Sequence, residues 1–187
     1  AVGPGATRRV GYAGLRDRAR RLSGALATLG VQPGSRVATL AWNSQDHVES
    51  WFAIMGMGAT CHTLNPRLTA AQSAAMLDQS QPNVLIASAD LLPLAYDIVA
   101  RSRPLTVIAI DHDEISPLPS ATSLEDLIAA AGADVGWGVF DENTACGLCF
   151  TSGTTGQPKG VTYTHRSTYL HTLRLLQADV MSLGAKD

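Results

Sequence analysis

The sequence predicts an α/β fold in which helices flank a mostly parallel β-sheet. Two observations support this prediction. Short apolar runs with strand character alternate along the chain with amphipathic segments of about ten or more residues, a pattern typical of βαβ units. The chain has 187 residues, of which 45% are hydrophobic, so it is long enough to bury a core.

The first predicted helix carries a single apolar stripe whose members are spaced four, three, four and three residues apart. They are Leu15, Ala19, Leu22, Leu26 and Leu29. Gly30 is expected to end this helix in the left-handed conformation, and Pro33 and Gly34 then turn the chain. The polar side of the helix is expected to be solvated. It carries Arg16, Arg18, Arg20 and Arg21.

A buried strand is predicted over residues 36–41, and a helix over residues 45–57. This helix gathers its large apolar side chains on one side. They are Val48, Trp51, Phe52 and Met55. A strand over residues 60–64 and a helix over residues 69–80 follow, with Thr69 as the expected N-cap.

The alternation continues with a strand over residues 84–87 and a helix over residues 91–100, for which Asp90 is the expected cap. A strand over residues 106–110 leads into a predicted surface loop, residues 111–122. Ser123, with Asp126 three residues later, resembles a capping box and is expected to begin a helix that reaches Ala131. A strand over residues 145–150 and a second short strand-like run over residues 161–163 flank residues 151–160, and the last predicted element is a helix over residues 166–181.

Residues 151–160 read Thr-Ser-Gly-Thr-Thr-Gly-Gln-Pro-Lys-Gly and are typical of a polyphosphate-binding loop. Glycines let backbone N–H groups converge on anionic oxygens, and hydroxyls add donors and contacts to a phosphate-bound Mg²⁺. Lys159 adds a mobile positive charge. The spacing excludes a Walker A loop, because Pro158 precedes the lysine and Gly160 follows it. The alternative is a solvated turn rich in Ser, Thr and Gly.

All ten positions resemble the phosphate-binding loop of the adenylate-forming superfamily, which comprises acyl-CoA synthetases, luciferases and adenylation domains of peptide synthetases. The resemblance continues through residues 10–15, although Gly11 and Gly14 depart from the usual pattern. Residues 65–69 look like the segment shared by CoA ligases, and residues 162–167 look most like CoA ligases of the fatty-acid type. The resemblance therefore implies that residues 1–187 are part of the large N-terminal domain, with the rest of that domain and the C-terminal domain absent.

The resemblance implies an ATP-dependent acyl-CoA ligase, with another adenylate-forming enzyme, an aryl-CoA ligase or a peptide-synthetase adenylation domain, as the alternative. Such a ligase converts a carboxylic acid, fatty in this interpretation, into acyl-AMP and then into a thioester with coenzyme A. It implies ATP, Mg²⁺ and CoA as cofactors and co-substrates, with Lys159 and Thr151 in catalysis. The nucleotide-binding residues would be Thr151, Ser152, Gly153, Thr154, Thr155, Gly156 and Lys159. The family's other catalytic segments lie further along, so this chain alone is expected to be inactive. A homodimer is left open, and no protein metal ligand is assigned.

The composition excludes several other classes of function. The net charge is −2, and no basic block alternates with aromatic residues, which argues against a nucleic-acid partner. No apolar stretch approaches the length of a membrane span. Three cysteines without a signal peptide predict free thiols in a reducing compartment, hence a cytoplasmic location.

Two rival interpretations remain: a non-catalytic α/β module that binds phosphate or nucleotide, and a redox domain built on the C-x-x-C pair, Cys146 and Cys149. A redox pair needs a helix N-terminus to lower a thiol pKa, whereas these residues fall inside a predicted strand and are expected on opposite faces. Both, like Cys61, are expected to be structural and buried. His165 is expected to support the loop structurally.

Overall fold

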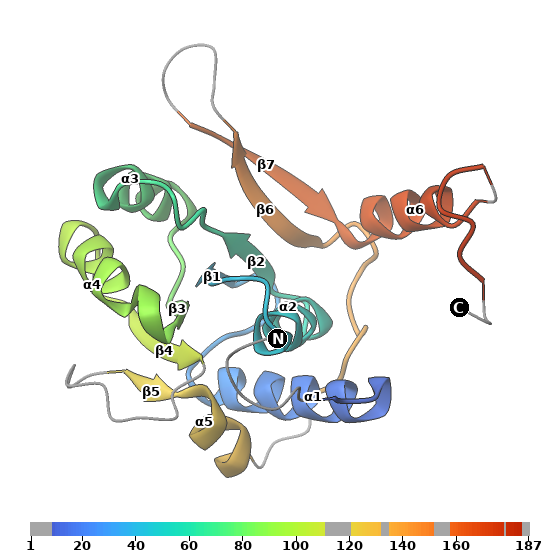
Figure 1. Ribbon diagram of the computed structural model, residues 1–187, viewed down its shortest axis with the longest axis horizontal. Helices are drawn as coiled ribbons and strands as arrows, with labels where there is room; N and C mark the ends of the chain where they lie inside the picture. The colour runs from blue at the N-terminus through green and yellow to red at the C-terminus, as the bar shows by residue number, and fades with distance from the viewer. Residues whose placement is uncertain (1–8, 111–120, 132–134, 152–157, 178, 185–187) are drawn as a thin grey trace.

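The computed structural model describes residues 9–110, 121–131, 135–151, 158–177 and 179–184. Within them lies one seven-stranded sheet with helices on both faces (Figure 1). The strands are β1 (Arg36–Leu40), β2 (Thr60–Thr63), β3 (Val84–Ser88), β4 (Thr106–Ile110), β5 (Thr122–Ser123), β6 (Ala145–Thr151) and β7 (Lys159–Thr164). The helices are α1 (Tyr12–Thr28), α2 (Gln45–Gly56), α3 (Ala70–Ser80), α4 (Leu92–Arg101), α5 (Leu124–Ala130) and α6 (His165–Leu175), and a 3₁₀ turn, η1 (Ala89–Leu91), precedes α4.

The strand order is β5-β4-β3-β1-β2-β6-β7, and every neighbouring pair is parallel except β6 and β7. The predicted mostly parallel α/β fold is therefore confirmed. Most predicted elements are present; the two-residue strand β5 was not predicted, because so short a pairing leaves no periodic pattern.

Two apolar clusters lie on opposite faces of the sheet. Val37 and Ile86 point into the cluster covered by α1, α2 and α5, whereas Ala38 and Leu85 point into the cluster covered by α3 and α4. Adjacent residues of one strand thus serve different layers, as the pleat requires. Because both faces of the central strands are buried, β1 and β3 read as nearly continuous apolar runs.

Several helix ends have the capping residues that the sequence predicts. Thr69 forms a capping box with Gln72 at the start of α3, and the Ser123 side chain accepts a hydrogen bond from the Asp126 N–H at the start of α5. Gly30, with φ +85°, ends α1 in the left-handed region as expected.

Asp90 was wrongly predicted as a cap. The 3₁₀ turn starts earlier, after Ser88, and the Asp90 carboxylate instead accepts a 2.8 Å hydrogen bond from the Trp42 indole. Helix α6 ends at Leu175 rather than at Met181. Asp179 would place a negative charge at the C-terminal end of a longer helix, where the helix dipole disfavours it.

The buried side of α2 includes polar groups, while large apolar side chains of the helix remain exposed. Glu49 and Ser50 are fully buried together with Ala53 and Ile54, whereas Trp51 and Phe52 are 41% and 48% exposed. Arg18 accounts for the buried Glu49 carboxylate. It was expected to be solvated but lies between α1, α2 and α5, where it pairs with Asp46, Glu49 and Glu125.

A test of the local fold is available at Gly58, which follows α2. It has φ +83°, and a Cβ there would lie 2.7 Å from Cδ1 of Phe140. Gly34 has the same φ but no atom within 4 Å of its Cβ position. We expect Gly58→Ala to lower the free energy of unfolding by about 2 kcal/mol and Gly34→Ala by about 1 kcal/mol, measured by urea denaturation. Equal losses would show that Phe140 does not constrain this turn.

Candidate active site

The predicted phosphate loop joins the two strands of a hairpin at one edge of the sheet. Because β1, β2 and β6 are parallel, their carboxyl ends meet at this edge, where α/β proteins commonly bind ligands. Strand β6 ends at Thr151 and β7 begins at Lys159, and these two residues face each other in the antiparallel register. The hairpin extends away from the helical layers (Figure 1). The fold thus holds both ends of the loop together, with both residues exposed.

The other candidate residues of the loop lie outside the described residues. They are Ser152, Gly153, Thr154, Thr155 and Gly156. Their assignment to a nucleotide therefore stays a prediction, whereas the positions of Thr151 and Lys159 are defined by strand pairing.

Close packing at Gly160 holds the loop's stem together. Gly160 faces Phe150 across the hairpin, and a Cβ there would approach Cδ1 of Leu148 to 3.1 Å. A larger residue would push against this apolar stem. The glycine after Lys159 therefore has a packing role that the sequence motif alone does not reveal.

The base of the hairpin is fixed where β7 passes into α6. Thr164 caps α6 through a capping box with Ser167, and the His165 N–H donates a 3.1 Å hydrogen bond to the Thr144 carbonyl. The His165 ring packs on Phe140 with centroids 4.5 Å apart, and burial lowers its pKa. These contacts agree with the structural position expected for His165.

A second cluster of polar groups, which the sequence did not predict, lies beyond the carboxyl end of β1. The Nδ1 atom of His47 lies 3.0 Å from the Trp42 carbonyl, so it must donate, and Nε2 accepts a 3.1 Å hydrogen bond from the Trp51 indole. Thr39 Oγ1 lies 3.0 Å from the same Nε2. These partners fix a neutral ring, and burial lowers the His47 pKa. The ring borders a cavity of about 440 Å³.

The cysteines do not form the redox site that the C-x-x-C spacing allows. Cys146 and Cys149 lie inside β6 rather than at a helix N-terminus, and all three cysteines, which fall in the described part of the chain, carry free thiols. Cys61 and Cys146 are buried as expected, but Cys149 is only half-buried. Cys146 and Cys149 also line one cavity instead of facing apart. A register shift between Ala145 and Gly147 interrupts the strand's alternation.

In the described residues, His, Cys, Asp and Glu side chains nowhere gather in groups of three or more that could hold a metal ion. The groups offered at the loop's ends are one hydroxyl and one ammonium. An ammonium cannot ligate a cation, so a Mg²⁺ ion at the loop would have to be held chiefly by substrate phosphates and water, the usual arrangement for magnesium with nucleotides.

A family profile and curated relatives match nearly the whole of this chain. A profile for the family described as AMP-binding enzyme matches residues 1–186. The 3-methylmercaptopropionyl-CoA ligase of Ruegeria lacuscaerulensis is 40% identical over 98% of this chain and 35% of its own length. The medium-chain-fatty-acid–CoA ligase of Ectopseudomonas oleovorans is 38% identical over 91% of this chain and 32% of its own length.

Solved structures also include proteins with this fold. The fold superposes on an anthranilate CoA ligase, crystallised in complex with anthranoyl-AMP, with a TM-score of 0.84 and 28% identity. That match covers 94% of this chain and 33% of the other. The chain belongs to the AMP-binding enzyme family of adenylate-forming proteins, and its relatives include acid–CoA ligases.

The chain spans about a third of the length of the curated relatives it matches. Among the described helices, none has both the length and the apolar character needed to cross a bilayer.

Proposed function

We propose that this chain is the nucleotide-phosphate-binding part of an ATP-dependent acyl-CoA ligase. The observation that carries the proposal is the pairing of Thr151 with Lys159 at the mouth of a ten-residue loop that matches the family motif at every position. The names of the curated relatives support CoA as the acceptor.

In the first step, a carboxylate oxygen of the acid attacks the α-phosphorus of ATP and pyrophosphate leaves, which forms acyl-AMP. Charge builds on the departing pyrophosphate, so N–H and hydroxyl donors of residues 151–156 and the Lys159 ammonium would stabilise the transition state. In the second step, the CoA thiol attacks the acyl carbon and AMP leaves. Bound Mg²⁺ would neutralise part of the phosphate charge.

Adenylation is tested with a protein of the relatives' full length that carries this sequence. We expect carboxylate-dependent exchange of pyrophosphate into ATP and, with CoA present, thioester formation. The 187-residue chain is expected to catalyse neither reaction, because the family's remaining catalytic segments lie beyond it. If the full-length protein bound ATP but showed no exchange with any acid, the non-catalytic nucleotide-binding alternative would be favoured.

The acid is proposed to be a fatty acid, on the strength of residues 162–167 and of the medium-chain relative. An aromatic acid is the second candidate, favoured by the superposition on the anthranilate ligase. A panel of octanoate, 3-methylmercaptopropionate and anthranilate, compared by kcat/KM, distinguishes these classes. Acyl-AMP formation without transfer to CoA would indicate another adenylate-forming enzyme, such as a peptide-synthetase domain.

Lys159→Ala should slow adenylation about 100-fold in the full-length protein, the effect typical of losing one charged group that stabilises a transition state. Lys159→Arg should recover part of the rate because it keeps the charge. Arg101→Ala is the matched control, since Arg101 is an exposed cation on α4, far from the loop in sequence, whose Nε pairs with Asp97 at 2.9 Å. Pyrophosphate exchange unchanged by Lys159→Ala would rule out this role.

A further inference from the structure

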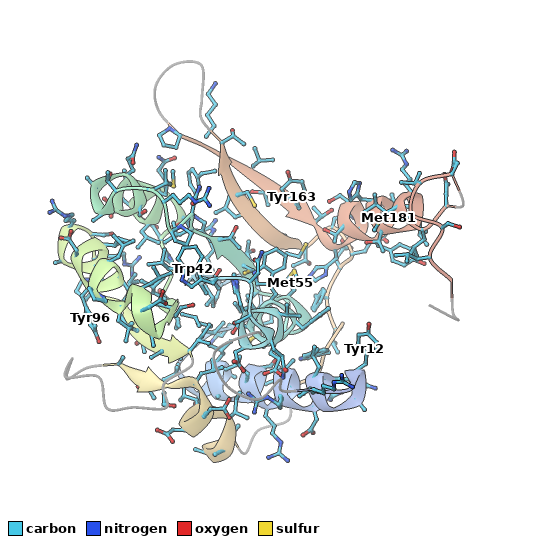
Figure 2. The ribbon with its side chains drawn as sticks, in the orientation of Figure 1. Tyr12, Trp42, Met55, Tyr96, Tyr163 and Met181 are labelled. Carbon is cyan, nitrogen blue, oxygen red and sulfur yellow. The ribbon has the colours of Figure 1, made fainter. Side chains whose placement is uncertain are left out.

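The hairpin that carries the phosphate loop is joined to the rest of the sheet over a short length. Strand β6 pairs with β7 at six positions but, among the described residues, with β2 at only two, Gly147 opposite Cys61 and Leu148 opposite His62. Gly147 also lies opposite Tyr163 of β7, which is labelled in Figure 2. The hairpin continues beyond these pairs, away from the helical layers (Figure 1). The backbone pairing with β2 therefore constrains the direction of the hairpin weakly.

A short segment before β6, residues 137–144, makes another connection to the base of the hairpin, and we call it the strap. The carbonyl groups of Glu142 and Thr144 in the strap accept hydrogen bonds of 2.7 Å and 3.1 Å from the N–H groups of Arg166 and His165. The Glu142 carboxylate also pairs with the Arg166 guanidinium. The strap thus holds the first turn of α6, which directly follows β7.

Two aromatic rings fix the strap to the end of α2, where two glycines leave room for them. A Cβ at Gly56 would lie 2.5 Å from Cδ2 of Trp137, and a Cβ at Gly58 would lie 2.7 Å from Cδ1 of Phe140. The Trp137 indole also donates a 2.9 Å hydrogen bond to the Ser23 hydroxyl of α1. The helical layer therefore holds the strap through close packing and one hydrogen bond.

Phe140 contacts both the helical layer and the base of the hairpin. Its ring lies where a Gly58 side chain would be, and the ring centroid is 4.5 Å from that of His165. His165 directly follows Thr164, the last residue of β7, whose first residue is Lys159. A strand of this length spans about 17 Å, so a tilt of about 10° at its base would displace Lys159 by about 3 Å. A small movement of His165 is therefore magnified at the loop.

We propose that Phe140 is a positioning residue for the phosphate loop, which it holds in place through His165. This role rests on the proposed adenylation and adds to it a residue outside the motif of residues 151–160. A misplacement of about 1 Å can lower the rate of a reaction about 100-fold, so loss of the Phe140 ring should affect how the protein handles the phosphates of ATP. Trp137 lies in the same strap, but its ring packs on α1 and α2, so it provides the control.

Kinetics of the full-length protein measure the effect on the nucleotide. Phe140→Leu should lower kcat/KM for MgATP about 10-fold in pyrophosphate exchange and leave the KM of the acid within about twofold. Phe140→Tyr should keep the parent values because it keeps the ring, and Trp137→Leu should lower the urea midpoint without raising the KM for MgATP. A residue that only supports folding would lower the amount of active enzyme and leave this KM unchanged. A KM for MgATP that Phe140→Leu does not raise would therefore overturn the proposal.

Hydrogen exchange gives a second measurement, which does not depend on ligase activity. In the 187-residue chain, Phe140→Leu should speed the exchange of the β7 amide protons about 10-fold and leave β3 and β4 unchanged. Trp137→Leu should act on α1 and α2 instead. The proposal is also overturned if Phe140→Leu leaves exchange at β7 unchanged, or if both variants speed it equally. If the full-length parent formed no adenylate, the proposed function would fail, and hydrogen exchange would still decide whether Phe140 anchors the hairpin.

Discussion

Arg18→Ala should lower the free energy of unfolding by about 3–5 kcal/mol, the cost typical of removing one partner from a buried ion pair. The Arg18 side chain is 18% exposed and its Nε donates to Oε2 of Glu49 at 2.8 Å, while the Glu49 side chain is fully buried. The Gln45 amide is another neighbour of Glu49, with a 2.6 Å hydrogen bond to Oε1. Without the guanidinium, Glu49 would keep a buried charge without its compensating cation.

Arg18 also joins three helices. It donates to Asp46 on α2 at 3.2 Å and to Glu125 on α5 at 3.0 Å. The hydrogen bond to Glu125 is the chief reason that the pKa of Arg18 is raised, so the residue stays charged at every working pH. One cation therefore fixes α1 against both neighbours that share its face of the sheet.

Urea denaturation at pH 7 measures the loss, and Arg21→Ala is the matched control. Arg21 lies on the same helix but forms an exposed pair with Asp17, at 55% and 66% exposure. Pairs of that kind contribute less than about 1 kcal/mol. Arg18→Ala combined with Glu49→Gln should recover part of the loss, because the second change removes the uncompensated charge. If the two arginine variants unfolded at the same urea concentration, Arg18 would be only a surface residue.

Arg18 also shows where sequence reasoning reaches its limit. The four-three spacing of α1 correctly located the helix and its buried residues Ala19, Leu22 and Leu26. The same pattern placed every arginine on the solvated side, because periodicity reports the polarity of a face and not what lies opposite it. The partners on α2 and α5 are 28 to 107 positions away in sequence.

Helix α2 shows the same limit. Local spacing gathers Val48, Trp51 and Phe52 on one side, and these side chains are 43%, 41% and 48% exposed. The opposite side is buried although it includes Glu49 and His47, because Arg18 satisfies Glu49 and the β1 region satisfies His47. Periodicity alone does not say which side of a helix faces the sheet.

The candidate site divides in a similar way. The motif of residues 151–160 was readable from local spacing, and the structure adds that strand pairing brings Thr151 opposite Lys159. The His47 cluster left no such signal. Its hydrogen bonds depend on how the segment after β1 turns back onto α2, and the nearby link from Trp42 to Asp90 spans 48 positions. Such bonds follow from tertiary packing alone.

Acid should destabilise this fold through His62, with a loss of about 3 kcal/mol between pH 6.5 and pH 4. His62 lies on β2 with no exposed surface, and burial lowers its pKa from 6.5 to about 4. Its Nδ1 lies 2.8 Å from the Ser80 hydroxyl, whereas the buried Nε2 meets no hydrogen-bond partner among the described residues. The Phe150 ring lies 5.0 Å away, between centroids, and offers no acceptor for a second proton.

The direction of this pH effect on stability follows from which state, folded or unfolded, binds the proton. Between pH 6.5 and pH 4 the unfolded chain binds a proton at His62 that the folded chain does not, so falling pH favours unfolding. The stabilisation is complete above about pH 6.5 and is lost as the pH falls to about 4. Urea denaturation from pH 7 to pH 4 measures this loss as the slope of the free energy of unfolding against pH.

His62→Gln should flatten this slope, although it lowers stability at pH 7 by disturbing a packed site. His171→Gln, on the exposed surface of α6, is the control for a histidine-to-glutamine change away from β2. The carboxylates are the same in all three proteins, so their acid titration cancels in the comparison. If His62→Gln and the parent chain lost stability equally between pH 6.5 and pH 4, His62 would accept its proton in the folded state. The ring would then have to reach water or an acceptor near Phe150, in place of the closed apolar packing between β2 and β6.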